Sequence, residues 1–188
     1  MTTQRLLLTV EEYLDELLTD LLAGAGPVAE IETVPLAEAL GRVLAEPVTA
    51  RGDVPAFANS AMDGYAVRLA DLTSLPATLR VVGDVPAGSP DDPAIAPGEC
   101  VRIMTGAPLP TDADTVVPVE RTDAGTDVVR IDEVGERGAH VRGAGEDVRG
   151  GQTIAGAGTT VTARVLGSLA AAGAGSVLVR RRPVVAVA

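Results

Sequence analysis

The sequence is unusual first in what it lacks. Its 188 residues contain no Trp and no Lys, and only one Cys, one His and one Phe. The absence of Lys excludes Schiff-base chemistry and the lysine of P-loop nucleotide-binding sites. One Cys and one His cannot build a common zinc site. Because the chain carries 26 Asp and Glu residues, a hard cation such as magnesium is the metal that the composition suggests.

The excess of acidic residues gives a formal net charge of −11 at pH 7. Such a chain repels nucleic acid and acidic membrane surfaces, and Arg180–Arg182 is its one dense basic run. No window of the sequence approaches a transmembrane span. The single Cys100 cannot form an internal disulfide, which fits a reducing cytosol. We therefore expect a cytoplasmic protein that binds neither nucleic acid nor membrane.

Hydrophobic periodicity and capping residues predict three helices. Thr9 and Glu12 have the spacing of a capping box, and a seven-residue apolar face follows them. Thr162 is placed to cap a later helix that Gly173 ends. The predicted helices cover residues 10–22, 36–44 and 163–171.

Short β-rich runs alternate with turn residues through the rest of the chain. The predicted strands cover residues 30–34, 78–82, 100–104, 115–121, 128–131 and 177–179. Asp123–Asp127 separates two of these runs and predicts a hairpin loop. Pro118 cannot donate a hydrogen bond to a neighbouring strand, so its strand is expected at a sheet edge. Strand spacing of this kind indicates a small, mostly β module, barrel-like in character.

The last residues form the apolar run Val184–Ala188, directly after Pro183. A continuous run of this kind is typical of a strand buried on both faces of a parallel sheet. Such a strand needs neighbours on both sides, and the sequence contains no candidates for them. We expect a chain that is truncated before a further domain.

The segment Asp53–Val67 is the first candidate for a functional loop. It contains Phe57, and it gathers Asn59, Ser60 and Asp63 just before a glycine. A carboxylate in such a loop can hold a hydrated magnesium ion, orient a water molecule or act as a base. The alternative is that Asn and Asp side chains satisfy the backbone of a turn. The residues by themselves slightly favour the alternative.

The segment Arg102–Pro108 is the second candidate. A predicted strand ends at Thr105, and Gly106 lets the backbone approach a ligand closely. The Thr105 hydroxyl and nearby backbone N–H groups could hold an oxyanion, or Thr105 could simply bond its own backbone, which the residues favour. The charged segment Arg142–Gly151 is expected to be a salt-bridged surface turn, and Cys100 a small buried apolar residue.

The candidate segments resemble the motifs of one known family. Asp53–Val67 resembles the signature of the MoeA family, the molybdopterin molybdenumtransferases, and is similar to the E domain of gephyrin. The resemblance continues through Pro35–Leu44, Arg102–Pro108 and Gly145–Asp147, in the order and spacing of the family. It covers nearly the whole chain.

The resemblance implies an α+β fold, rich in β structure, that is truncated before the family's α/β molybdopterin-binding domain. An elongated linker domain would be interrupted by an inserted, small β-barrel-like domain and preceded by an N-terminal helix. The implied boundaries are 1–26 for the helix, 27–49 and 136–179 for the linker domain, 50–135 for the inserted domain and 180–188 for the first strand of the missing domain.

The resemblance also implies an activity. Family members insert molybdate into adenylylated molybdopterin and release AMP, with magnesium present. The full-length protein would be a cytoplasmic, homodimeric molybdopterin molybdenumtransferase, and this fragment alone would be inactive. Molybdopterin adenylyltransferase and acceptor molybdoenzymes would be its protein partners. The alternative is a non-enzymatic dimerisation or scaffold module with the same fold.

The resemblance assigns roles to single residues. Asp63 and Thr105 match family residues implicated in activity: Asp63 would position metal or water, and Thr105 would hydrogen-bond an anionic oxygen. Asn59, Ser60 and Gly106 would bind substrate. In family homodimers the inserted domain faces the molybdopterin-binding domain of the partner subunit, so this loop would complete the partner's site.

The sequence departs from the family pattern at two places. Ala58 stands where the family commonly has Asp, so the loop has lost one carboxylate. Gly143 and Ala144 replace the Arg often found before the Gly-Glu-Asp motif. The second departure weakens any anion-binding role for Arg142–Gly151.

Overall fold

The computed structural model describes residues 9–24 and 30–183. The chain divides into two compact units, which we call the first unit (Met1–Thr49 with Thr153–Ala188) and the second unit (Ala50–Gln152). Residues 136–152, which the resemblance assigns to the linker domain, cluster with the second unit. The apolar run 184–188 lies outside the described residues, so its strand stays a prediction.

Helix α1 spans Val10–Gly24, and it begins at the predicted capping box. The backbone N–H of Thr9 donates to Oε2 of Glu12 at 2.8 Å, and the backbone N–H of Glu12 donates to Oγ1 of Thr9 at 3.2 Å. These bonds satisfy N–H groups that have no partner inside the helix. Across the described part of the chain, no helix is both long and apolar enough to cross a membrane.

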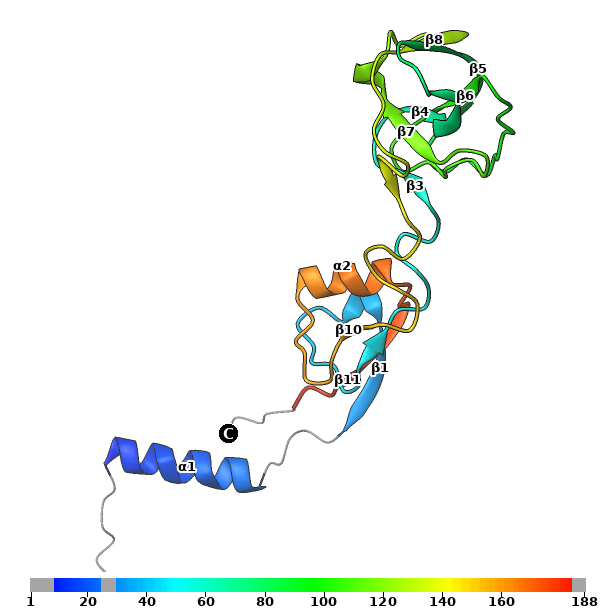
Figure 1. Ribbon diagram of the computed structural model, residues 1–188. Helices are drawn as coiled ribbons and strands as arrows, with labels where there is room; N and C mark the ends of the chain where they lie inside the picture. The colour runs from blue at the N-terminus through cyan, green and yellow to red at the C-terminus, as the bar shows by residue number, and fades with distance from the viewer. Residues whose placement is uncertain (1–8, 25–29, 184–188) are drawn as a thin grey trace, which may run out of the picture. The chain divides into compact units, whose positions relative to one another are not determined.

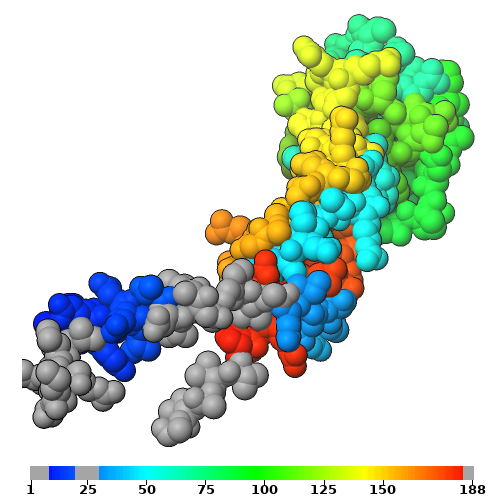
Figure 2. Space-filling view, turned by 90° about the horizontal axis from the view of Figure 1, so that it is seen from below, coloured from blue at the N-terminus to red at the C-terminus, as the bar shows by residue number. Residues whose placement is uncertain are grey.

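The first unit pairs segments that are far apart in the sequence. Strand β1 runs antiparallel to β11, from the pair Ile31 and Arg180 to the pair Pro35 and Ser176. Figure 2 shows the same neighbours as surfaces, with red β11 atoms beside blue β1 atoms. Besides α1, the elements of this unit (Figure 1) are β1 (Ile31–Pro35), the 3₁₀ helix η1 (Leu36–Glu38), β2 (Val48–Thr49), β10 (Thr153–Ala155), α2 (Ala163–Ala171) and β11 (Ser176–Arg180).

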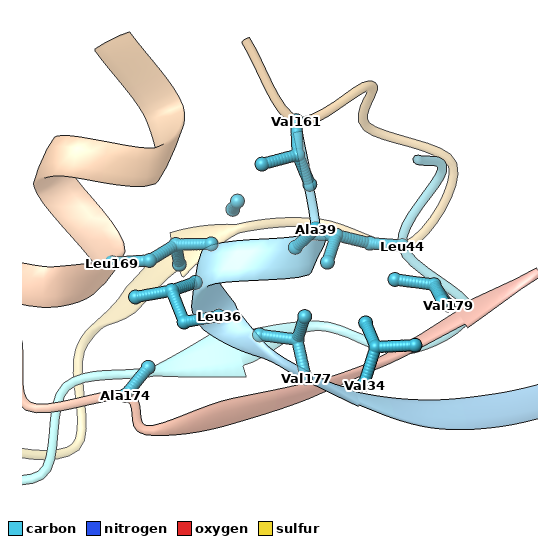
Figure 3. Close-up of a cluster of buried hydrophobic side chains, with 10 residues drawn as sticks. Val34, Leu36, Ala39, Leu44, Val161, Leu169, Ala174, Val177 and Val179 are labelled. Carbon is cyan, nitrogen blue, oxygen red and sulfur yellow. The ribbon is translucent and has the colours of Figure 1, made fainter. Parts of the chain in front are cut away.

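A single apolar cluster holds these segments together. Figure 3 shows Leu36 of η1, Leu169 of α2 and Val177 of β11 directed into a shared core. Helix α2 has the predicted bounds, and Oγ1 of Thr162 accepts a hydrogen bond from the backbone N–H of Val165 at 3.3 Å. The cap fixes where the helix begins, and the buried Leu169 fixes which face it presents to the core.

The predicted helix over 36–44 was wrong. Helical structure there is limited to η1, Leu36–Glu38. Gly41 has a φ of +74°, a left-handed conformation that ends the helical turn. Beyond it, Leu44 forms an isolated antiparallel bridge with Val179, because its backbone finds partners in neighbouring segments instead of in a helix. Core burial explains Leu36 and Leu44 of this apolar stripe, which are buried, but not Leu40, which is 54% exposed.

The second unit is organised around a curled five-stranded sheet in the order β7-β4-β6-β5-β8. All neighbours are antiparallel except β5 and β6, which are parallel. Closure into a barrel stays a prediction. Its elements (Figure 1) are β3 (Asn59–Ser60), β4 (Gly64–Val67), η2 (Leu69–Asp71), β5 (Ala77–Val85), β6 (Glu99–Ile103), β7 (Thr115–Pro118), η3 (Val119–Arg121), β8 (Val128–Ile131) and β9 (Val141–Arg142).

Both faces of the inner strand β4 are buried. Along β4, Tyr65 and Val67 belong to one buried cluster, while Ala66 between them belongs to another. The hydroxyl of Tyr65 donates to the carbonyl oxygen of Gly125 at 2.8 Å, which satisfies its buried polar end. This double burial explains why the strand is apolar at successive positions instead of at alternate ones.

The sequence predictions for the sheet edges had mixed outcomes. Pro118 lies in β7, which is an edge strand, as predicted. The hairpin predicted at Asp123–Asp127 was wrong, since only an isolated bridge between Thr122 and Ile131 joins the two sides of this loop. The two strands around it, β7 and β8, do not pair with each other along their length, because they occupy opposite edges of the five-stranded sheet.

We predict that Leu169→Ala lowers the free energy of unfolding of the first unit by about 2–5 kcal/mol, the usual effect of removing a buried leucine side chain. Leu169 is fully buried in the core cluster. Hydrogen exchange of the slowest β11 amides measures the effect, because β11 belongs to the same unit.

The matched control is Leu40→Ala, the same substitution in the same unit at a side chain that is 54% exposed. It should change stability by less than about 0.5 kcal/mol. Equal losses for the two variants would contradict the packing shown in Figure 3.

Candidate functional site

Strand pairing brings the two candidate segments together. In the antiparallel pair β4–β6, Gly64 lies opposite Ile103. Asp63 directly precedes β4 and Thr105 follows β6 by two residues, so both lie at the same end of this pair. A Cβ atom at Gly64 would lie 2.0 Å from the carbonyl oxygen of Val117 in β7, so only glycine permits this close approach next to Asp63.

Thr105 makes two hydrogen bonds to a single oxygen of Asp63. Its backbone N–H and its hydroxyl both donate to Oδ1, each at 2.7 Å. Oδ2 accepts no hydrogen bond from any described residue. The carboxylate is therefore held in one orientation through Oδ1, while Oδ2 keeps its capacity to accept a proton, a metal ion or a water hydrogen.

These contacts also set the charge of the site. The hydrogen bonds from the Thr105 backbone and then from its hydroxyl lower the pKa of Asp63 below the ordinary value of an aspartate, and the positive charge of Arg102 adds to the effect. Asp63 is exposed, so the carboxylate remains charged at neutral pH and faces solvent.

Asn59 and Ser60 lie inside the loop and not on its outer surface. They are 6% and 1% exposed. Nδ2 of Asn59 donates to the carbonyl oxygen of Phe57 at 3.2 Å, and the hydroxyl of Ser60 donates to the carbonyl oxygen of Met62. Both side chains satisfy local backbone, which is the alternative that the sequence left open. Contact between these two residues and a substrate stays a prediction.

Gly106 joins the two candidate segments through its backbone. Its φ of +80° is a left-handed conformation that favours glycine, and its N–H donates to the carbonyl oxygen of Ser60 at 2.8 Å. The next residue, Ala107, accepts a hydrogen bond from the N–H of Ser60 at 3.0 Å. The loop that holds Asp63 is thus fixed to the turn after Thr105 by main-chain bonds on both sides.

A small pocket opens beside the carboxylate. It is lined by Asp63, Gly64, Arg102, Ile103, Met104 and Val119. Arg102 belongs to the Arg102–Pro108 motif but was not among the predicted site residues. The sequence signal that could have found it is a single charged residue between two apolar residues of a predicted strand. Val101 and Ile103 are both buried, so the residue between them faces the other side.

Asp63 does not belong to a ready-made metal centre. Nowhere in residues 9–24 and 30–183 do three Asp, Glu, His or Cys side chains come together in a cluster that could hold a metal ion. Cys100 is fully buried as predicted, and burial raises the pKa of its thiol to about 12. It therefore stays protonated and is a poor ligand or nucleophile.

The charged segment 142–151 behaves as the sequence predicted. Arg142 forms an ion pair with Asp147, and Glu146 accepts a hydrogen bond from the backbone N–H of Gly143 at 2.8 Å. These partly exposed pairs hold a turn together within the second unit. The turn also supports the site loop, because Arg142 of β9 pairs with Asn59 of β3.

Comparison with known proteins identifies relatives along most of the chain. Residues 8–173 match the family model described as the MoeA N-terminal region, domain I and II. The molybdopterin molybdenumtransferase 2 of Mycobacterium tuberculosis is 48% identical over 145 residues, which cover 75% of this chain and 36% of that protein. The molybdopterin molybdenumtransferase of Bacillus subtilis is 38% identical over 166 residues, which cover 84% of this chain and 39% of that protein.

A solved structure shares the fold. The crystal structure of the molybdopterin biosynthesis moeA protein from Pyrococcus horikoshii OT3 matches with a TM-score of 0.76 and 32% sequence identity, over 82% of this chain and 42% of that one. The chain thus spans about two fifths of the length of the relatives that it matches.

We predict that Thr105→Val raises the pKa of Asp63, because it removes the hydroxyl donor and keeps the backbone donor. In the parent chain the folded-state pKa lies below the unfolded one, so this contact stabilises the fold at pH values above the unfolded pKa. The stabilisation is lost as the pH falls through the folded pKa. In the variant the loss should be smaller and complete at a higher pH, because the folded-state pKa lies closer to the unfolded one. Carboxyl ¹³C NMR titration measures both pKa values.

The matched control is Thr111→Val. Thr111 donates to Asp92 through its backbone N–H and its hydroxyl at 2.8 and 2.7 Å, and these bonds lower the pKa of Asp92 in the same way. This variant should raise the pKa of Asp92 and leave that of Asp63 unchanged. An unchanged Asp63 titration in Thr105→Val would show that the hydroxyl bond is not formed in solution.

Proposed function

The chain belongs to the MoeA family, and we propose that the full-length protein is a molybdopterin molybdenumtransferase of molybdenum cofactor biosynthesis. It inserts molybdate into adenylylated molybdopterin and releases AMP. The named relatives support this activity for the whole protein. The chain spans about two fifths of the length of those relatives. We propose that it supplies part of the site and is inactive alone.

The observation that carries the proposal is the unequal use of the two Asp63 oxygens. Oδ1 takes both hydrogen bonds from Thr105, whereas Oδ2 takes none from the described residues. An oriented, charged carboxylate with one open oxygen can position a water molecule or a metal-bound substrate. Asp63 acts directly in this scheme. Thr105 acts through Asp63, since its hydroxyl proton is already donated there and an anionic oxygen would have to compete for it.

Magnesium fits this chain only in part. Mg²⁺ in enzymes of phosphate-containing substrates is commonly held by one or two carboxylates, substrate oxygens and water. Asp63 can give one such ligand through Oδ2, and no cluster of the described residues completes the shell. The ion would neutralise charge on the substrate, and its other ligands would come from the substrate and from residues outside this chain.

The remaining loop residues support the carboxylate. Asn59 and Ser60 hold the loop through their side chains, and Gly106 ties it to the turn after β6. We assign them to shaping the substrate-binding surface. Because the chain carries half of a site, we further propose that the protein is a cytoplasmic homodimer in which Asp63 and Thr105 complete the site of the partner subunit. It would receive substrate from a molybdopterin adenylyltransferase and deliver product to acceptor molybdoenzymes.

In the full-length protein, Asp63→Asn should lower the rate of molybdenum insertion by about 10²-fold or more, because the amide keeps the shape and loses the charge. AMP release and metal incorporation are the measurements. Asp92→Asn is the matched control, since Asp92 also accepts a backbone and a hydroxyl hydrogen bond from one threonine, here with one bond on each carboxylate oxygen. Wild-type turnover in Asp63→Asn would remove Asp63 from catalysis and would favour a scaffold role for this loop.

The shared site predicts complementation between subunits. Co-expression of this 188-residue chain with full-length Asp63→Asn protein should restore part of the lost activity, because mixed dimers regain one intact carboxylate. The same chain carrying Asp63→Asn is the control and should restore nothing. Equal activity with the two chains would contradict a site built across the dimer.

A further inference from the structure

We propose that Arg102 holds an oxyanion of the substrate beside Asp63, which makes it the anion-binding residue of this half of the site. The inference rests on the proposed function and deepens it. The ligand is a tetrahedral oxyanion, a chemistry that molybdate and the phosphate of adenylylated molybdopterin share.

The position of Arg102 in the sheet directs it to the pocket. It lies in β6 opposite Tyr65 of β4 and beside Asp84 of β5. Its neighbours in the strand, Val101 and Ile103, are buried, whereas Arg102 is exposed. Arg102 lines the pocket that contains Asp63, and it also lines a second pocket with Val81, Gly83, Asp84 and Thr126. Arg102 therefore forms part of the wall of both pockets.

Within residues 9–24 and 30–183, the guanidinium group of Arg102 has neither an ion pair nor a hydrogen-bond partner. Eight of the described arginines form ion pairs with Asp or Glu within 4.0 Å. Arg102 forms none with the described residues, and it donates no hydrogen bond to them. Its five N–H donors, arranged in a planar fork, are thus available to a ligand. Bidentate hydrogen bonding to an oxyanion is the geometry that this fork suits best.

Charge explains why the site needs this residue. The chain carries a formal net charge of −11, and Asp63 adds a fixed negative charge inside the pocket itself. An oxyanion that approaches Asp63 is repelled unless a positive charge lies close by. Among the residues that line this pocket, Arg102 is the one cation. It can balance the carboxylate and give the incoming anion a place to bind.

The competing interpretation is structural. Arg102 is the cross-strand neighbour of the buried Tyr65, and its aliphatic stem could cover that ring. Loss of such cover would lower stability and would leave substrate affinity unchanged. Only anion binding by Arg102 predicts that its substitution raises the KM for substrate. The KM therefore separates the two interpretations.

The first test measures the KM of each substrate for full-length Arg102→Gln protein. We expect the KM of one oxyanion substrate to rise about 10- to 100-fold, the effect of losing charge-assisted hydrogen bonds. A rise for molybdate alone, or for adenylylated molybdopterin alone, identifies the bound group. Arg102→Lys should recover part of the loss. Unchanged KM values for both substrates overturn the proposal, whatever happens to kcat or to stability.

The matched control is Arg51→Gln, which removes the same charge from an exposed arginine of the same unit that lines neither pocket. Its KM values should equal those of the parent. An equal rise in both variants would show that net charge alone is responsible, and it would overturn the assignment to Arg102.

The second test is independent of turnover. Titration of the 188-residue chain with sodium molybdate, and separately with inorganic phosphate, should shift the backbone amide resonances of Ile103 and Thr105. The shifts should be lost in Arg102→Gln and kept in Arg51→Gln. Absence of any shift in the parent, or an unchanged midpoint in Arg102→Gln, overturns the proposal. If the full-length protein inserts no molybdenum, the proposed function fails, and this titration still decides whether Arg102 binds an oxyanion.

Discussion

The antiparallel pairing of β4 with β6 is the constraint on which the candidate site depends. It sets Gly64 opposite Ile103 and so brings Asp63 to Thr105, which lie 42 positions apart in the sequence. The pairing requires glycine at position 64, since β7 approaches within 2.0 Å of where a side chain would begin. The position of the site thus follows from which residues lie at the end of these paired strands.

A threonine that is hydrogen-bonded to an aspartate does not by itself indicate a functional site. Thr111 donates to Asp92 through the same two groups as Thr105 to Asp63, but it bonds one carboxylate oxygen with each, whereas Thr105 bonds Oδ1 of Asp63 with both. The two pairs differ in their surroundings. Asp63 lies in a pocket whose wall includes Arg102, which forms no ion pair with the described residues. An oriented carboxylate beside such an arginine is what sets this candidate site apart from the loop that contains Asp92.

Local signals in the sequence predicted those elements whose cause is local. The capping residues Thr9 and Thr162 gave correct helix starts, and Pro118 gave a correct sheet edge. The apolar stripe over 36–44 led to a wrong helix prediction, because Leu36 and Leu44 are apolar for another reason: they pack in one cluster with residues of the distant strand β11. The parallel β5–β6 pair and the burial of Asn59 depend on contacts far along the chain, which periodicity does not encode.

The electrostatics of the candidate site rest on one oriented carboxylate and one arginine in the same pocket wall. The hydrogen bonds from Thr105 keep Asp63 ionised, so the carboxylate alone would repel an approaching anion. Arg102 offsets that negative charge from the neighbouring strand. Because both donors of Thr105 bond Oδ1, Oδ2 accepts no hydrogen bond from the described residues and lies open beside that arginine's pocket.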